Sequence, residues 1–160
     1  MVMEHEFLTI QKDFVFYMFI GEYKHNLDAK GRLAIPAKFR VLLEGGAVVT
    51  KGLDNCLFLY PKHEWEQLAR KLAALPISKA NTRAFSRLML AGAAEVDFDS
   101  QGRIILPEHL RKFAGLNKTT VVAGLFDRLE IWDEAVWEAY KEGTEAKSSD
   151  IAEALGELDV

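Results

Sequence analysis

The chain has 160 residues, of which 49% are hydrophobic, 11% aromatic and 28% charged. This composition is that of a globular protein, and it excludes collagen, low-complexity polymers and wholesale disorder. The formal net charge of −4 argues against a protein coated on every side by nucleic acid. The one cysteine, Cys56, excludes an internal disulfide or a thiolate zinc cluster and favours a reducing compartment.

The first seventeen residues carry no export signal. Charged and titratable side chains interrupt any apolar segment there, and the longest apolar run, residues 14–20, is too short to span a bilayer. No later stretch is longer. We therefore expect a soluble, intracellular protein that has no membrane partner.

Two stretches 71 residues apart share the pattern Asp-x-x-Gly-Arg. Residues 28–36 (DAKGRLAIP) reappear as residues 99–107 (DSQGRIILP). Beyond one inserted residue the separation becomes 72, and it relates residues 65–66 to residues 137–138 (Trp-Glu in both). Matches so evenly spaced indicate two copies of one unit.

Each copy predicts the same order of elements, β-β-α-β-β and then a helix. A strand leads into a tight turn at Gly31 or Gly102, where glycine supplies a positive φ. Pro36 and Pro107 stand where a short helix begins, because the first helical position needs no N–H group. The tail from Ser148 is expected to be frayed. The predicted strands cover residues 19–27, 33–35, 47–51, 57–60, 94–98, 104–106, 119–123 and 129–132, and longer helices begin near residues 62, 78 and 133.

A unit of about 60 to 70 residues with such short hairpins has a marginal core by itself. Two copies in one chain therefore suggest that the copies bury their faces against each other, as the halves of a dimer do.

The Asp28-x-x-Gly31-Arg32 motif has two compatible interpretations. In the first it is turn chemistry, in which the aspartate caps the backbone and pairs with the arginine across the turn. In the second the hairpin is a DNA reader, since it also carries Lys24, His25 and Lys30, and arginine matches guanine and phosphate. The aspartate would then orient Arg32.

Charge is distributed unevenly along the chain. Residues 22–40 carry a net charge of +3 and residues 62–90 one of +4, whereas residues 126–160 hold eleven acids against three bases. Such asymmetry is typical of a nucleic-acid binder with one contact face, although charge runs can also be solvated surfaces. The hairpin of the second copy is acidic apart from Arg103, so we expect the first copy to make the main contacts.

An enzymatic function has little support in the sequence. The four histidines lack metal-ligand spacing, and there is no phosphate loop and no nucleophile elbow. A hydrolase or transferase that uses Cys56 or the Asp97/Asp99 pair would lack an assembled site. We predict no enzyme activity, no metal, no cofactor and no small-molecule substrate.

The run from Gly21 to Pro36, together with the second motif at Asp99 to Arg103, closely resembles the MraZ family of bacterial transcriptional regulators. The resemblance extends from about Met18 to Tyr140. It implies an α+β fold of the SpoVT-AbrB type, a tandem swapped-hairpin β-barrel pseudo-dimer with flanking helices. The expected organisation is an extension outside the fold (1–17), a first repeat (18–76), a connecting helix (77–92), a second repeat (93–142) and an acidic C-terminal tail (143–160).

The resemblance also implies a function. Family members bind short G-rich direct repeats in double-stranded DNA ahead of the division and cell-wall gene cluster, commonly as repressors, in ring-shaped homo-oligomers located in the cytoplasm and at the nucleoid. The expected DNA-binding residues are Arg32, Lys30, Lys24, His25, Lys38 and Arg103, and the expected structural residues of the motif are Asp28, Gly31, Asp99 and Gly102. The alternative is an oligomeric scaffold for protein partners in which DNA binding is vestigial.

Overall fold

The structure is a computed structural model, and it describes residues 18–158; the predicted N-terminal extension lies outside this range. The element order β-β-α-β-β-α occurs twice, as the sequence predicts. The strands are β1 (Phe19–Asn26), β2 (Arg32–Ala34), β3 (Ala47–Lys51), β4 (Leu57–Pro61), β5 (Ala94–Val96), β6 (Arg103–Ile105), β7 (Thr119–Phe126) and β8 (Leu129–Asp133). The helices are α2 (Ala37–Arg40), α3 (Lys62–Ala73), α4 (Ala80–Ser86), α5 (Glu108–Phe113), α6 (Glu134–Ala146) and α7 (Ser148–Ala154), with short helical turns at Val41–Leu43, Arg87–Ala91 and Gly156–Leu158.

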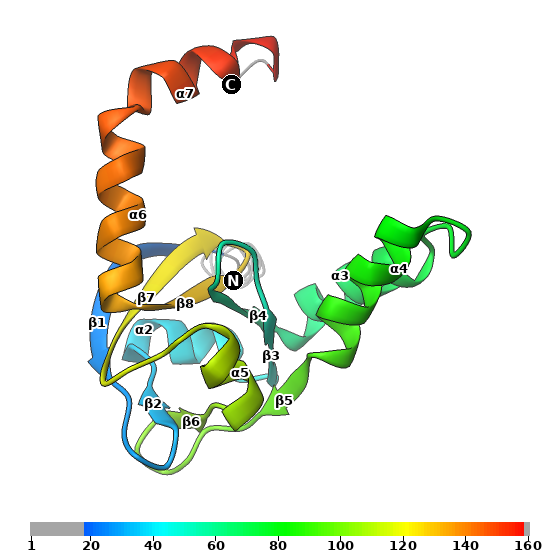
Figure 1. Cartoon of the computed structure of the whole chain (residues 1–160). Helices are drawn as coiled ribbons and strands as arrows, with labels where there is room; N and C mark the ends of the chain where they lie inside the picture. Colours follow the sequence, from blue (N-terminus) through cyan, green and yellow to red (C-terminus); the bar gives the residue numbers. More distant parts are fainter. Residues whose placement is uncertain (1–17, 159–160) are drawn as a thin grey trace, which may run out of the picture.

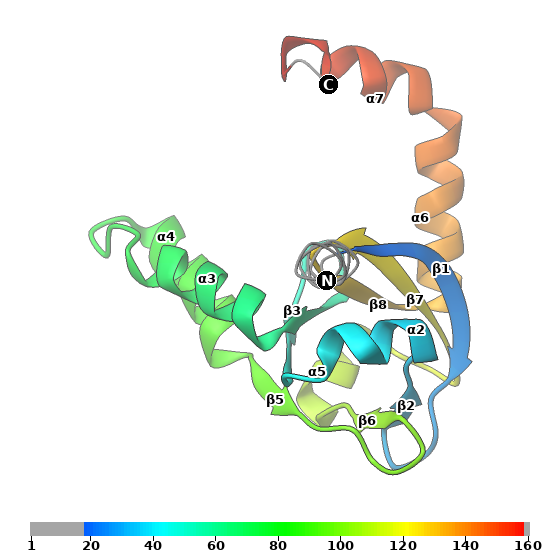
Figure 2. The ribbon, with the colours of Figure 1, turned by 180° about the vertical axis from the view of Figure 1, so that it is seen from behind.

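The strands form two sheets. Six of them make one antiparallel sheet in the order β1-β7-β8-β4-β3-β5, and β2 pairs with β6 in a separate two-stranded ribbon. Figure 1 shows the ribbon and its two connecting turns at one end of the molecule, and the view from behind in Figure 2 agrees.

The two repeats exchange strands with each other. β1 of the first repeat pairs with β7 of the second, and β5 of the second pairs with β3 of the first. A pseudo-two-fold axis relates the halves, because Leu33 lies opposite its own counterpart Ile104, and Phe58 lies opposite its counterpart Glu130. The predicted association of the copies is thus achieved inside one chain, through a swapped arrangement of hairpins.

The closed barrel that we expected is not formed within residues 18–158. β1 and β5 are the edges of the six-stranded sheet, and a single bridge between Leu27 and Leu33 connects this sheet to the ribbon. The reason is the tight turn at each motif, which takes the chain out of the large sheet. β2 and β6 are only three residues long, and they pair with each other across the axis. The architecture is therefore α+β with an open sheet and a ribbon.

Alternating side chains cover both faces of the large sheet. On β4, Leu57 and Leu59 point into the main core with the ribbon and α2, whereas Phe58 and Tyr60 point into a second cluster beneath α3. This alternation follows from the two-residue period of a strand. The main core also contains Leu33 and Ile104, which are fully buried beneath the ribbon, so the packing of both repeats fixes the position of the ribbon.

Two helical arms extend away from the sheets (Figures 1 and 2). The first is a hairpin of α3 and α4 that returns to β5, and the second is α6 followed by α7, which turns off at Lys147. Residues from Ser148 were expected to be frayed, but the structure has α7 and a short helical turn there. None of the helices within residues 18–158 is long and apolar enough to cross a membrane.

Candidate nucleic-acid interface

The β2–β6 ribbon has one buried face and one open face. Leu33 and Ile104 are fully buried on the inner side. Arg32 pairs with Ile105, and Ala34 pairs with Arg103. Because directly paired residues of antiparallel strands project from the same face, the outer face carries both arginines and Ile105, which is 61% exposed.

In the turn before β2, Asp28 holds Arg32 in place through hydrogen bonds. Oδ1 of Asp28 accepts hydrogen bonds from the backbone N–H groups of Lys30 (3.0 Å) and Arg32 (2.8 Å). Oδ2 accepts a hydrogen bond from Nε of Arg32 at 2.5 Å. No residue in the described part of the chain accepts a hydrogen bond from the Nη groups of Arg32, so the end of the guanidinium is available to a ligand.

The second motif repeats this geometry. Oδ1 of Asp99 accepts hydrogen bonds from the backbone of Gln101 (2.8 Å) and Arg103 (3.0 Å), and Oδ2 accepts one from Nε of Arg103 at 2.8 Å. The turn interpretation is therefore confirmed, whereas the reader interpretation, in which the same aspartate orients the arginine toward DNA, stays a prediction.

Each turn also depends on the other repeat. Gly31 has a φ of +79°, its carbonyl accepts a hydrogen bond from Leu106 N–H at 2.8 Å, and the Arg111 side chain of α5 lies against it. Across the pseudo-two-fold axis, the Arg40 side chain lies against Gly102 in the same way. This position of Arg40 and Arg111 was not predicted from the sequence. Each arginine follows the proline of its own motif by four residues, so the sequence shows that the two arginines are equivalent. It does not show that each one lies against the turn of the opposite repeat.

We expect Gly31→Ala to destabilise the protein by roughly 1–3 kcal/mol. A Cβ atom there would lie 2.8 Å from Nε of Arg111 and 2.9 Å from the Leu106 carbonyl oxygen, in a backbone conformation that L-residues rarely adopt. Urea denaturation measures the change in the free energy of unfolding. Gly45→Ala is the matched control, because no atom of residues 18–158, apart from Gly45 itself and its chain neighbours, lies within 4 Å of a Cβ at that site. Equal stability of the two variants would contradict this account of the turn.

The two aspartates make stability depend on pH. Hydrogen bonds from the Arg32 backbone, and then from its side chain, lower the pKa of Asp28 below the ordinary 3.8, and Arg103 lowers the pKa of Asp99 in the same manner. A carboxyl whose pKa is lower in the folded state stabilises the fold above its unfolded pKa and loses that contribution as the pH falls through the folded value. We expect the free energy of unfolding to decrease below about pH 4.

The measurement is urea denaturation at a series of pH values, with the Asp28→Asn/Asp99→Asn variant beside the wild type. The variant should lose less stability than the wild type on acidification, because two of the responsible carboxyls are gone. An identical pH profile for both proteins would argue against the contribution of the two aspartates. Glu22 and Glu108 also have lowered pKa values and remain in both proteins.

The other predicted contact residues lie farther from the ribbon's outer face. Lys24 on β1 forms an ion pair with Glu134 at the start of α6 (2.9 Å). Nζ of Lys38 lies 4.6 Å from the centre of the Tyr23 ring. Burial lowers the pKa of His25 below the ordinary 6.5, so its imidazole is neutral at pH 7. Lys30, in contrast, is exposed in the turn itself.

The residues considered for enzyme chemistry are not assembled into a site. Cys56 is buried, burial raises the pKa of its thiol, and Sγ donates a hydrogen bond to the Leu53 carbonyl oxygen. The carboxylate of Asp99 is occupied by its own turn. Within residues 18–158 no group of three potential ligands could hold a metal ion.

A two-stranded β-ribbon is one of the elements that can enter the major groove of DNA. The major groove is about 12 Å wide and admits a β-ribbon, and arginine pairs with O6 and N7 of guanine through two hydrogen bonds. An arginine whose Nε is held by a carboxylate keeps its outer N–H groups in a fixed direction, which reduces the entropy lost on binding. Ile105 adds an apolar side chain between the two arginines.

The chain is similar to known proteins along most of its length. The model of the family described as "MraZ protein, putative antitoxin-like" matches residues 18–88 and again residues 89–157. Proteins named "Transcriptional regulator MraZ" are similar along nearly their whole length. The one from Desulforamulus reducens is 50% identical over 141 residues (88% of this chain and 99% of the relative), and the one from Pediococcus pentosaceus is 54% identical over 138 residues (86% and 96%). The relative from Halothermothrix orenii is 49% identical over 143 residues (89% and 100%). These relatives are named as regulators and not as enzymes. The chain, with its two interlocked repeats, belongs to the MraZ family.

Proposed function

We propose that this protein is a sequence-specific DNA-binding transcriptional regulator that reads DNA with the outer face of the β2–β6 ribbon. The observation that carries the proposal is the pair of arginines on that face, each fixed by the aspartate of its own turn. A ribbon with this face enters a major groove readily, and the relatives' name is consistent with regulation of transcription.

The residues have different roles in this proposal. Arg32 makes the main base contact, and Lys30, which is exposed in the same turn, contacts phosphate. Arg103 makes a weaker contact because acidic residues surround its hairpin. Lys24 and Lys38 add phosphate contacts after they leave Glu134 and Tyr23, their present partners. The neutral His25 contributes a hydrogen bond and not a charge.

The resemblance to the family suggests the target. We propose that the protein binds short G-rich direct repeats in its own promoter, ahead of the division and cell-wall gene cluster, and that it represses this promoter. Such a role places it in the cytoplasm, associated with the nucleoid.

The two helical arms support a ring of identical subunits. The α3–α4 arm, residues 62–91, has six basic residues against two acids, whereas the α6–α7 arm, residues 134–158, has seven acids against two bases. Each arm exposes large apolar side chains, which are Ile77 and Phe85 on the first and Val136, Tyr140, Ile151, Leu155 and Leu158 on the second. An acidic arm of one copy against the basic arm of the next is a head-to-tail contact, and such contacts generate rings when the rotation closes.

A ring would display ribbons at a fixed spacing. Several weak ribbons could then engage successive direct repeats at once, because each bound ribbon raises the effective concentration of the next. This arrangement accounts for useful affinity in a protein whose net charge is −4.

The proposal is tested by fluorescence anisotropy with duplexes that contain one, two or three G-rich repeats from upstream of the protein's own gene, beside a sizing column. We expect each added repeat to raise affinity, by roughly 10²-fold or more in total for linked sites. Equal, weak binding of all duplexes and of a scrambled duplex by an intact oligomer would overturn DNA regulation. That result would favour the scaffold, whose acidic arm docks a protein partner.

A further inference from the structure

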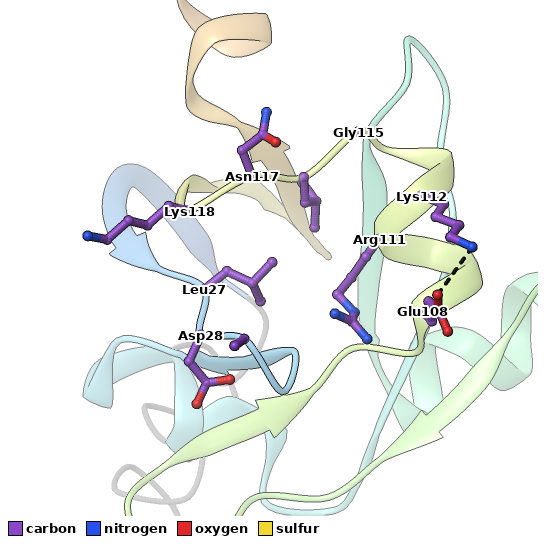
Figure 3. Close-up of a pocket in the computed structure, with 10 residues that line it drawn as sticks. Leu27, Asp28, Glu108, Arg111, Lys112, Gly115, Asn117 and Lys118 are labelled. Carbon is purple, nitrogen blue, oxygen red and sulfur yellow. Dashed lines mark ion pairs between the residues drawn. The ribbon is translucent and has the colours of Figure 1, made fainter.

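A groove beside the first hairpin is formed by both repeats. It has a volume of about 700 Å³, and residues 27–29 of the first repeat form one wall. The opposite wall is α5 and the segment up to Lys118, which belong to the second repeat. In Figure 3, Arg111 points between α5 and Leu27, while Lys112 and Lys118 lie on opposite rims.

The uncompensated charge of this groove is positive. Asp28 is occupied by the hydrogen bonds of its own turn, and Glu108 pairs with Lys112 at 3.2 Å on the surface. Nε of Arg111 donates to the Leu106 carbonyl oxygen. Neither Arg111 nor Lys118 forms an ion pair with any residue between 18 and 158, so both charges are open to an anion.

The pseudo-two-fold counterpart of this groove is acidic. The groove beside the second hairpin, about 540 Å³, contains Arg40 as the counterpart of Arg111. Asp99 is occupied by its own turn, as Asp28 is, and the acids of the groove without such partners within residues 18–158 are Glu44 and Asp97. Val41 stands where Lys112 stands in the second repeat. The backbone symmetry that relates the two hairpins is therefore not accompanied by charge symmetry.

A duplex that receives the ribbon in its major groove must carry one phosphate strand past each side of the ribbon. One strand then passes the basic groove and the other passes the acidic one. We infer that the groove between the first hairpin and α5 binds the phosphate backbone of DNA, with Arg111 inside the groove and Lys112 and Lys118 on its two rims contacting separate phosphates, and that its acidic counterpart does not. This inference rests on the proposed function.

Two consequences follow from this arrangement. The second repeat contributes to DNA binding with α5, beside the hairpin of the first repeat. A ribbon with two-fold backbone symmetry also acquires a preferred direction on DNA, which direct repeats require and which a symmetric contact would not supply.

The test is the salt dependence of binding to the repeat duplex and to a scrambled duplex, measured with the full chain. We expect Lys112→Ala/Lys118→Ala to reduce the slope of log K against log[salt] by up to about 0.9 for each lost phosphate contact. Both duplexes should be affected equally, since phosphate contacts carry no sequence information. Lys51→Ala, which removes one charge on β3 outside the groove, the ribbon and the arms, is the control and should retain the wild-type slope.

A variant that is expected to strengthen DNA binding completes the test, because a gain in affinity cannot result from unfolding of the variant. Glu108→Gln frees Lys112 and should make the slope steeper and the binding of both duplexes tighter, whereas Asp54→Asn in the exposed turn between β3 and β4 should not. Wild-type slopes in both groove variants, with the wild type still selective for the repeat duplex, would overturn the phosphate site and leave the proposed function standing. A wild type that binds neither duplex would overturn both.

Discussion

Replacing Arg32 by alanine should weaken binding of the repeat duplex by roughly 5- to 150-fold, because a bidentate arginine–guanine contact is worth roughly 1–3 kcal/mol of discrimination. The variant should lose its preference for the repeat sequence, so that it binds the repeat and the scrambled duplex with similar affinity. Fluorescence anisotropy with the two duplexes gives both dissociation constants.

The matched control is Arg103→Ala, which removes the equivalent arginine from the acidic hairpin and should cost less affinity. A sizing column establishes that both variants keep the oligomeric state of the wild type. An Arg32→Ala protein that discriminates between the duplexes as well as the wild type does would exclude Arg32 as the reader, and the opposite ranking of the two variants would assign the main contact to the second repeat.

Leu33→Ala should destabilise the whole molecule by about 2–5 kcal/mol, the range for truncating a buried leucine. Leu33 is fully buried, and it pairs with Ile104 on the pseudo-two-fold axis. A cavity at this position therefore destabilises the hairpins of both repeats. Urea denaturation measures the free energy of unfolding, and DNA binding should weaken in parallel as the ribbon loses its fixed position.

Ile105→Ala is the control on the same ribbon. Its side chain projects from the outer face, and surface substitutions usually change stability by no more than about 0.5 kcal/mol. Similar destabilisation by both substitutions would mean that the ribbon is not anchored by its inner face, which would remove the structural basis of the proposed interface.

The sequence was sufficient to predict what depends on local patterns. The 71-residue repeat, the element order and the aspartate–glycine–arginine turn are encoded in neighbouring residues, and the structure confirms them. Glycine at positive φ and an aspartate that caps its own turn are recognisable from spacing alone. The resemblance to the family rested on these same residues and is confirmed by the two matched repeats.

The features that depend on contacts between the two repeats could not be predicted in the same detail from the sequence. The barrel was expected to close, but the three-residue strands at the axis pair with each other, and within residues 18–158 a single bridge, between Leu27 and Leu33, connects them to the large sheet. Arg111 and Lys118 were not singled out, because they are some 80 residues from the hairpin that they flank. Lys24 looked like a contact residue in the sequence, and only the fold shows that α6 brings Glu134 to it.

The swapped arrangement connects stability to function. Each motif turn is held by its own aspartate and by a backbone hydrogen bond from the opposite repeat to the carbonyl of its glycine. One repeat alone would lose these cross-repeat contacts and the partner strand of its ribbon. Duplication within one chain also allowed the two hairpins to diverge in charge while their backbones stayed equivalent.

The most direct test of the central claim is the specificity ratio of the wild-type protein. It is the dissociation constant for a scrambled duplex divided by that for the repeat duplex, both measured by anisotropy at one physiological salt concentration. We predict a ratio of about 10³ or more, which is the range of specific regulators. A ratio near one would contradict the claim that the ribbon reads sequence.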